Sequence, residues 1–434
     1  MRGRLPLAPD CSGKTMAIIQ AVRGMNDIMP DAVGWWQMVE NAAREVLESF
    51  GYREVRTPVV EKLELFARSI GESTDIVEKE MYSFEDRNGE WLALRPEATA
   101  SVVRCFIQHA LHSDSALLKL YEIGAMFRHE RPQKGRYRQF HQIDAEVFGA
   151  DSPMVDAEMM HMLGLLIERV GISGVKLNVN TLGCPDCRLT YREILKSFLK
   201  ERAERLCADC MRRLETNPLR VFDCKVEECR ALLDSAPMLV DYICEDCRGH
   251  FDAVKNYMEK LGTRYEVNPK IVRGLDYYMR TTFEVISDRL GAQNAIGGGG
   301  RYNGLVRSLG GPDVAAIGFA IGMERLIMLL QQERRQSERT PRFFVAALGN
   351  EPLEKAFLVV QKLRERGIEA EMDYEGRSLK GQMRRADKSG ARYVLILGEN
   401  ELSLGQIQLR DMREKTQRLL SLEDIVVQIE GLRD

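Results

Sequence analysis

The spacing of apolar residues predicts a mixture of helices and antiparallel strands in the first half of the chain. Apolar residues recur with helical spacing over 32–50, and Gly51 then ends the helix. Residues 52–60 predict a strand, in which Pro58 suits a sheet edge or an interface. Asn88-Gly89 lies between two short strand-like runs and predicts a β-hairpin.

The pattern continues with a helix predicted at 97–111 and two long strands at 117–130 and 139–149, joined by a basic loop. Helices mixed with antiparallel hairpins are typical of an α+β domain and not of a doubly wound parallel sheet. This domain is expected to end in a helix near Gln332, which a charged linker follows.

The last hundred residues alternate regularly between strand and helix patterns. The predicted elements are a strand at 342–348, a helix at 353–367, a strand at 368–374, a helix at 378–390 and a strand at 391–398. A glycine follows each of the two helices, as is common at helix ends. We therefore predict a separate small α/β domain over residues 341–434.

A block in the middle of the chain differs in character from its surroundings. Residues 183–262 contain eight of the ten cysteines and many charged helical stretches. We interpret them as an insertion into one domain formed by residues 16–182 and 263–333. Residues 1–15 are basic and lack the apolar core of a secretory signal, so we expect a disordered tail that takes no part in the fold.

Composition narrows the class of protein. Hydrophobic residues make up 44% and charged residues 29% of the chain, as in soluble globular proteins. No apolar run approaches the ~18–20 residues needed to cross a bilayer, so no membrane association is expected. The net charge of −3 gives no global sign of nucleic-acid binding but leaves room for a local basic surface. Many cysteines without an export signal indicate thiols or metal ligands in a cytoplasmic protein.

The strand at 139–149 has one polar and one apolar face. Alternation places His141, Ile143, Ala145 and Val147 together on a face that suits a core. The opposite face carries Phe140, Gln142, Asp144 and Glu146. That face is either a solvated edge or a wall of polar acceptors for a ligand.

The loop before this strand is rich in cations. It contains Arg128, Arg131, Lys134, Arg136 and Arg138, with Glu130 as the only acid. Such a density of positive charge repels itself unless anions are supplied, and arginine forks match phosphate oxygens. The loop and strand therefore indicate a site for a phosphorylated ligand and an amine-bearing one. A basic surface loop without a ligand is the alternative.

Three other segments carry candidate chemistry. Glu97 and Thr99 stand at a helix start, where they either cap the helix or bind an ammonium group. Arg273 precedes an aromatic pair, and the glycine run at 297–300 either lets backbone approach a ligand or forms a loose hairpin. Arg325 lies in the first turns of an apolar helix, where an arginine usually faces solvent.

The cysteines of the block form four close pairs. Paired thiols at these spacings suit tetrahedral zinc, and eight of them complete two sites or one site with spares. Reduced cysteines that merely pack are the alternative. The pairs are Cys184 with Cys187, Cys207 with Cys210, Cys224 with Cys229 and Cys244 with Cys247.

Taken together, these segments resemble the class II aminoacyl-tRNA synthetases, and the resemblance to the bacterial histidyl-tRNA synthetase family is close over residues 22–434. The strand with Pro58 resembles the first class motif, which forms a dimer interface. Residues 126–148 and 318–326 resemble the second and third motifs, and residues 272–285 and 297–305 resemble the histidine-specific segments. Several long motifs in the family's order make a chance match implausible.

The resemblance implies a fold and an activity. The fold is a class II antiparallel-sheet catalytic domain with a helical cysteine-rich insertion and a C-terminal α/β anticodon-binding domain. The activity is ligation of L-histidine to tRNA(His), with ATP and Mg²⁺ as the substrate complex and histidyl-adenylate as intermediate. The resemblance further implies a homodimer and a structural role for any zinc. No segment is left over for an editing domain.

The resemblance also assigns roles to residues that match its motifs. Arg128, Arg273 and Arg325 are expected to carry catalysis. ATP is expected to contact Arg128, Glu130, Arg136, Phe140 and Arg325. Histidine is expected to contact Glu97, Thr99, Arg128, Gln142, Glu146, Arg273, Tyr277 and Tyr278. Ala98 departs from the glycine that many relatives carry, which adds one methyl group near the site. In the last domain, candidate phosphate contacts are Lys380, Arg384, Arg385 and Lys388.

Three other functions compete with this one. A synthetase paralogue that regulates histidine biosynthesis binds histidine without charging tRNA, but such relatives tend to lack the arginine equivalent to Arg273 and the terminal domain. A ligase for proline or threonine would not need Glu146 and the tyrosine pair. A plain nucleic-acid-binding module would not need ATP-facing arginines in separate segments.

Overall fold

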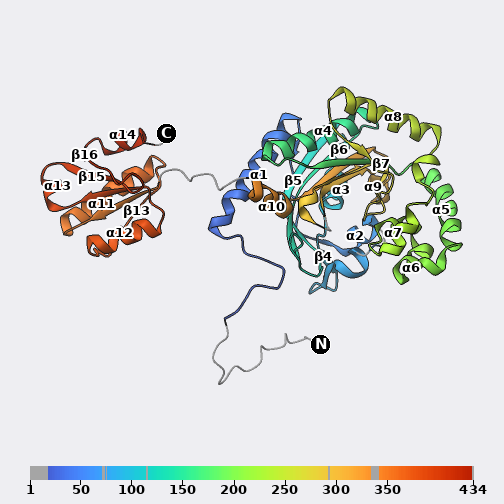
Figure 1. The fold of residues 1–434 in the computed structure, drawn as a ribbon, viewed down its shortest axis with the longest axis horizontal. Coiled ribbons are helices and arrows are strands. Elements are labelled where there is room, and N and C mark those ends of the chain that lie inside the picture. Colours follow the sequence, from blue (N-terminus) through green and yellow to red (C-terminus); the bar gives the residue numbers. More distant parts are fainter. Residues whose placement is uncertain are drawn as a thin grey trace, which may run out of the picture. The chain divides into compact units, whose positions relative to one another are not determined.

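The protein, described by a computed structural model, folds into two compact units, Met1–Arg335 and Gln336–Asp434 (Figure 1). The structure describes residues 18–70, 74, 76–113, 116–291, 294–333 and 342–432. The tail predicted at 1–15 and most of the charged linker lie outside these ranges.

An eight-stranded sheet forms the framework of the first unit. Its order is β1-β5-β6-β11-β10-β9-β7-β8, and every neighbouring pair is antiparallel except β1 with β5 and β7 with β8. The predicted α+β class is thereby confirmed. The strands are β1 (Arg53–Glu54), β5 (Leu118–Phe127), β6 (Gln139–Phe148), β7 (Lys176–Thr181), β8 (Glu266–Val267), β9 (Met279–Ile286), β10 (Ala295–Arg301) and β11 (Ala316–Gly322).

One face of this sheet carries the main core. Four helices cover it: α1 (Pro30–Ser49), α4 (Pro153–Val170), α8 (Glu245–Lys260) and α10 (Met323–Glu333). Ile143, Ala145 and Val147 are buried there, as the alternation in β6 predicts. Burial of a side chain of the size of valine or isoleucine contributes about 1.5–3 kcal/mol to folding. The sheet is thus held rigidly from this side.

The opposite face holds the polar residues of β6. β6 is an inner strand between β5 and β11, and Gln142, Asp144 and Glu146 on its polar face are buried, so the solvated-edge interpretation is wrong. The short helices α3 (Thr99–Gln108) and α9 (Leu305–Ser308) and part of the cysteine-rich block contribute to the hydrophobic cluster on this side.

A smaller sheet lies in the same unit. Its order is β2-β4-β3, formed by Val60–Lys62, Trp91–Leu94 and Tyr82–Glu85, with α2 (Leu63–Ile70) beside it. The hairpin predicted at Asn88-Gly89 is confirmed, with a φ of +84° at Gly89. The single strand predicted over 52–60 is wrong. Pro58 has no N–H to offer a ladder, and the chain crosses there from the large sheet to the small one.

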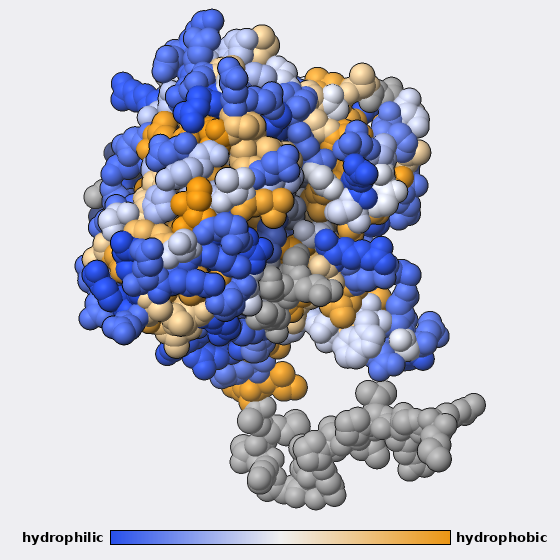
Figure 2. All heavy atoms as spheres, turned by 90° about the vertical axis from the view of Figure 1, so that its right-hand side faces the viewer, coloured by the Kyte–Doolittle hydropathy of each residue, from blue (hydrophilic) through white to orange (hydrophobic). Residues whose placement is uncertain are grey.

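The cysteine-rich block is helical. It runs through α5 (Pro185–Lys200), α6 (Ala208–Thr216), α7 (Glu227–Leu233) and α8, with short turns at Ala203–Arg205, Pro218–Asp223 and Leu239–Asp241. In Figure 1, α5, α6 and α7 gather at one end of the unit, while α8 lies near α4, against which it packs. Figure 2 views the unit from that end and shows hydrophilic residues over much of the face, with scattered hydrophobic spots.

The second unit confirms the alternation predicted for the tail. Its sheet has the order β13-β12-β14-β15-β16, parallel among the first three and antiparallel beyond. The antiparallel pair and the last two helices were not predicted. The elements are β12 (Phe343–Ala347), α11 (Asn350–Glu365), β13 (Ala370–Met372), α12 (Leu379–Lys388), β14 (Tyr393–Leu397), α13 (Glu399–Ser403), β15 (Gln406–Asp411), β16 (Gln417–Ser421) and α14 (Ile425–Glu430).

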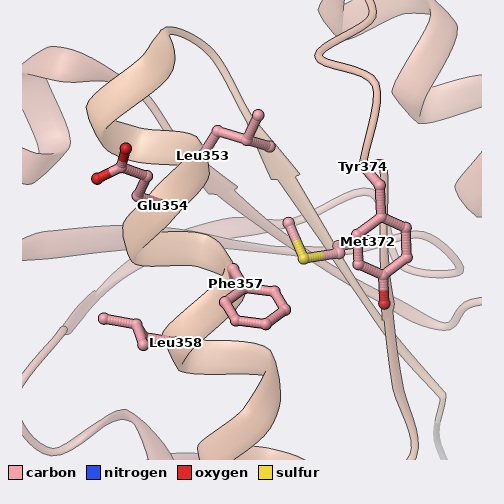
Figure 3. Close-up of a pocket in the computed structure, with 6 residues that line it drawn as sticks. All are labelled: Leu353, Glu354, Phe357, Leu358, Met372 and Tyr374. Atoms are coloured by element: carbon pink, nitrogen blue, oxygen red, sulfur yellow. The ribbon is translucent and has the colours of Figure 1, made fainter.

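A pocket of about 410 Å³ lies in this second unit (Figure 3). Leu353 and Phe357 of α11 point toward Met372 and Tyr374, whereas Leu358 points away. Its lining is mostly apolar and includes none of the residues that match the synthetase motifs.

Candidate functional site

The glycine run forms an inner strand of the large sheet and not a loose hairpin. β10 lies between β9 and β11, and glycine is required because neighbours come too close for a side chain. A Cβ on Gly298 would lie 2.8 Å from Arg273 Nη1, and one on Gly300 would lie 3.0 Å from Tyr278 Cδ1. Because Gly298 and Gly300 have no side chains, Arg273 and Tyr278 can pack directly against the backbone of β10.

Glu146 stands at the centre of the polar face. Thr99 Oγ1 donates to one carboxyl oxygen over 2.6 Å, and the Tyr302 hydroxyl donates to the other. Burial raises the pKa of Glu146 to about 8, although both hydroxyls oppose the rise. Burial therefore favours the protonated form of this carboxyl group. A Cβ on Gly318 would collide with Glu146 Oε2, so this glycine also makes room for it.

Tyr302 was not among the predicted site residues. It is almost fully buried, at 1% exposure, and its ring centroid lies 5.7 Å from that of Tyr277. The only sequence indication was its place directly after the glycine run and Arg301. A buried tyrosine usually has a partner for its hydroxyl, which Glu146 supplies here.

The raised pKa of Glu146 predicts a pH dependence of stability. In the unfolded chain the carboxyl loses its proton near its ordinary pKa of 4.5, whereas in the folded protein it keeps the proton to about pH 8. The folded state therefore binds more protons in this window, and the stabilising contribution present below pH 4.5 declines as the pH rises to 8. The expected decline is on the order of 3–5 kcal/mol.

Urea unfolding of the wild type and of Glu146→Gln at intervals between pH 5 and pH 9 measures this effect. The free energy of unfolding of the wild type, relative to that of Glu146→Gln, should fall toward pH 8 and then level off, since the amide does not titrate. Parallel pH profiles for both proteins would contradict the prediction.

Two tyrosines and an arginine form one wall of the site. The ring centroids of Tyr277 and Tyr278 lie 4.6 Å apart, and the Arg273 guanidinium lies 5.5 Å from the Tyr278 centroid. Arg273 Nη1 lies 3.4 Å from a carboxylate oxygen of Glu284. Arg273 Nε is buried and has no hydrogen-bond partner among the residues that the structure describes. A partly buried guanidinium with a spare donor suits an incoming anion.

The start of α3 contributes a second carboxyl group. Glu97 is buried, and one of its oxygens accepts the Ala100 N–H in the first turn of α3 over 2.9 Å, whereas the Thr99 hydroxyl bonds to Glu146 instead of capping the helix. Burial raises the pKa of Glu97, while the nearby charge of Arg128 opposes the rise. Gln142 Oε1 and both oxygens of Asp144 are buried without a partner in the described ranges of the chain. This face therefore offers unused acceptors to a ligand with N–H groups.

The predicted ATP-facing residues converge next to this wall. Arg128 lies 5.1 Å from the Phe140 ring centroid, and Arg136 Nη1 donates to Glu130 over 2.7 Å. Burial, and after it the positive charge of Arg136, lowers the pKa of Arg325. Cations gathered this closely favour a bound polyanion.

Arg325 does not face solvent, contrary to the expectation for its helix position. Its Nε donates to the Gly135 carbonyl over 3.2 Å, and its Nη1 donates to the Ala295 carbonyl. The side chain reaches back from α10 across the strand ends to the basic loop. Position in a helix could not reveal this, because both carbonyls come from distant segments.

The eight paired cysteines form two separate clusters. The first consists of Cys184, Cys187, Cys244 and Cys247, and the second of Cys207, Cys210, Cys224 and Cys229; within each, all sulfur atoms lie within 4.8 Å of one another. Four thiolates around zinc, with Zn–S bonds of about 2.3 Å, have sulfur separations of about 3.8 Å. Pairs at 3.5 and 3.7 Å match that geometry.

Backbone N–H groups point at these sulfur atoms. The Cys244 N–H donates to Cys187 Sγ over 3.1 Å, and the Cys207 N–H donates to Cys229 Sγ over 3.2 Å. Such donors stabilise thiolates, so the donor set suits a metal better than simple packing.

In the second unit, the four predicted phosphate contacts on α12 are exposed. Arg385 also donates to Asp373 over 2.7 Å, which leaves Lys380, Arg384 and Lys388 as the better candidates. In the described part of the chain, no helix combines the length and the apolar composition needed to span a membrane.

Comparison with known proteins connects this geometry to a family. Residues 24–326 match the family model for histidyl-tRNA synthetase, and residues 342–432 match the one for the anticodon-binding domain. A histidine–tRNA ligase of Syntrophotalea carbinolica is 52% identical over 94% of this chain and 97% of its own length. One from Desulfatibacillum aliphaticivorans is 51% identical over 96% of this chain and 99% of its own.

A solved structure agrees with this comparison. The crystal structure of apo histidyl-tRNA synthetase from S. aureus superposes with a TM-score of 0.79 at 34% identity. The match covers 95% of this chain and 99% of that one. Sequence and fold thus agree over both units.

Proposed function

This chain belongs to the histidyl-tRNA synthetase family, and we propose that it ligates histidine to tRNA(His) by way of histidyl-adenylate, using Arg128, Arg273 and Arg325. The observation that carries the assignment of residues is the meeting of two groups of side chains. Cations gather around Arg325, and a buried carboxyl stands among tyrosines at Glu146.

In the first step, the carboxylate of histidine attacks the α-phosphorus of ATP, and diphosphate leaves. The nucleophile is already ionised, so no general base is needed, and catalysis consists of positioning and neutralising charge. Arg128 and Arg273 hold the α-phosphate and the histidine carboxylate. Arg136 and Arg325 face the β- and γ-phosphates of the MgATP substrate, and Phe140 stacks on adenine. In the second step, a tRNA hydroxyl attacks the adenylate carbonyl, and AMP leaves.

Selection of histidine follows from the polar face. Glu146 and Tyr278 contact the imidazole nitrogens, while Glu97, Thr99 and Gln142 receive the α-ammonium group. A site with buried polar groups rejects apolar analogues by roughly 10⁴-fold or more, because these groups would be left unpaired. An editing domain is therefore unnecessary.

Amino-acid-dependent ATP–pyrophosphate exchange tests the proposal. Exchange with histidine and with no other amino acid supports it. Absence of exchange with every amino acid would favour the regulatory paralogue instead. Two features argue against that alternative: Arg273 is present, and residues 342–432 match the anticodon-binding domain. The same domain accounts for tRNA(His) as a partner.

Each cysteine cluster is proposed to hold one structural zinc ion. We predict two zinc ions per chain in protein purified without chelator or affinity-tag metal, measured by elemental analysis. Cys184→Ser should reduce this to about one, because three thiolates hold zinc less firmly than four. Cys105→Ser is the matched control, since Cys105 belongs to neither cluster and should leave two. Zinc-free protein would remove the proposal.

The proposal extends to a homodimer in the cytoplasm. The small sheet and the loop before it expose Val59, Val60, Phe84 and Trp91, with Trp91 54% exposed. Exposed apolar residues on one element suit an interface, and this element begins beside Pro58 of the first class motif. A solution mass of twice 49.5 kDa supports the dimer, and a monomeric mass contradicts it.

A further inference from the structure

The segment 271–278 carries Arg273, Tyr277 and Tyr278 but has no helix or strand of its own. It enters β9 only at Met279. The positions of its site residues therefore depend on contacts made by other parts of the chain. Several of these contacts come from the cysteine-rich block.

The first contact is a side chain next to the first cysteine cluster. Arg188 directly follows Cys187 in the first turn of α5. Its Nη1 donates to the Tyr278 carbonyl over 3.0 Å and to the Asp276 carbonyl over 3.4 Å. One guanidinium thus holds the backbone on both sides of Tyr277.

The second contact lies two residues beyond the segment, at the start of β9. Arg280 has a φ of +48°, a conformation that non-glycine residues rarely adopt and that needs support from its surroundings. Its N–H donates to the Gly183 carbonyl over 2.8 Å, and its own carbonyl accepts the Leu182 N–H over 2.7 Å. Its side chain pairs over 2.6 Å with Asp246, which lies between Cys244 and Cys247.

The second cluster approaches the same segment from the η4 turn (Pro218–Asp223), which leads into Cys224. Arg220 Nη1 donates to the Arg273 carbonyl over 3.3 Å. Asn217 Nδ2 donates to a carboxylate oxygen of Asp276 over 3.0 Å. The segment is therefore in contact with chain next to both clusters.

The first cluster joins the start of α5 to the start of α8, and of these two helices α8 packs against the large sheet. Cys184 and Cys244 are the N-terminal caps of α5 and α8. α8 is anchored to the large sheet, since His250 lies 3.3 Å from Asp156, and Asp156 in turn pairs with Arg301 of β10. The four cysteines therefore fasten the start of α5, and Arg188 with it, to a helix whose place is already fixed.

From this arrangement we infer that the first cysteine cluster, when it holds its metal, acts through Arg188 as a positioning element for the histidine site. Loss of the metal releases the start of α5 and loosens the segment around Tyr278, so that histidine binds more weakly while ATP binding is little affected. The inference rests on the proposed histidine contacts of Arg273 and Tyr278 and on the proposed zinc. It gives the block a role in amino-acid binding that is independent of tRNA.

Arg188→Ala is the decisive variant because it leaves all eight thiols in place. It should retain two zinc ions per chain, weaken histidine binding roughly tenfold, and change the KM for ATP less than twofold. Histidine binding is measured by calorimetry without ATP, so the result does not depend on turnover. Arg188→Lys keeps a cationic donor and should restore most of the affinity. Cys184→Ser should lose one zinc ion and weaken histidine binding to a similar extent.

Arg192→Ala is the matched control. Arg192 lies one turn further along α5, and its Nη2 donates to the Thr216 carbonyl, outside the segment. This variant should keep wild-type zinc content and histidine affinity. Tyr278→Phe distinguishes a failure of the positioning role from a failure of the proposed histidine site. If it weakens histidine binding while Arg188→Ala and Cys184→Ser do not, the positioning role is overturned and the proposed site stands. If Tyr278→Phe has no effect either, both fail.

Discussion

Replacement of Arg273 by alanine is expected to lower the kcat of histidine-dependent pyrophosphate exchange by about 10³-fold. In the structure, this guanidinium has a weak contact to Glu284, at 3.4 Å, and a buried Nε with no partner among the described residues. Its donors are thus available for the charge that develops on the α-phosphate. Loss of a preorganised donor at such a point acts mainly on the transition state, so kcat should fall more than the KM for ATP rises.

A conservative substitution and a surface control accompany the Arg273→Ala variant. Arg273→Lys keeps the charge but not the planar fork, and its activity should lie between those of the wild type and the alanine variant. Arg169→Ala is the control, because the Arg169 side chain is 63% exposed and pairs with Glu45 at the surface, a kind of contact worth about 0–1 kcal/mol. It should exchange at the wild-type rate. An Arg273→Ala enzyme with unchanged exchange would contradict the proposed role.

Sequence patterns predicted most of the elements, because each depends on its own residues. The alternation in 139–149 identified both faces of β6, and Asn88-Gly89 identified a hairpin. The prediction of a single strand at 52–60 was wrong because this stretch, although its pattern is continuous, contributes β1 to the large sheet and leads into β2 of the small sheet. Local periodicity records which side chains are buried, but it does not record which partner strand buries them.

The sequence predicted most of the residues of the candidate site, but it did not predict the hydrogen bonds that hold them in place. The resemblance placed Glu146 and Thr99 in one site, and the structure shows them hydrogen bonded. Tyr302 was missed because a tyrosine after glycines carries no pattern of its own. Arg188 was missed for a different reason. It donates hydrogen bonds to backbone carbonyls about ninety residues away in the sequence, and the spacing of residue types along the chain cannot indicate such a contact.

The cysteines illustrate the same limit. Spacing alone left open whether the cysteines form two sites or one site with spares, because the grouping of the four close pairs depends on the path of the chain from α5 to α8. The structure groups the first pair with the last and the two middle pairs with each other. The two ends of the block therefore meet at the first cluster, where Arg280 and Asp246 also pair.

Replacement of Glu146 by alanine is expected to raise the KM for histidine by roughly 10²–10³-fold while changing the KM for ATP little. The estimate follows from the loss of hydrogen bonds from the imidazole to a buried carboxyl group, each worth about 1.5–3 kcal/mol when one partner is charged. The change also leaves the Thr99 and Tyr302 hydroxyls facing a cavity without their shared acceptor. Histidine would then have to enter a site whose polar groups lack their partner.

Glu146→Gln tests whether charge or shape matters at this position. The amide fills the same volume and keeps one acceptor, so the fold is preserved, but it cannot ionise to meet an imidazole N–H with a full carboxylate. Its KM for histidine should lie between those of the wild type and Glu146→Ala, as measured by pyrophosphate exchange at saturating MgATP. Far-UV circular dichroism establishes that both variants are folded. Equal histidine KM values in all three proteins would show that Glu146 does not contact the imidazole, and the selection of histidine would then have to come from the tyrosine wall.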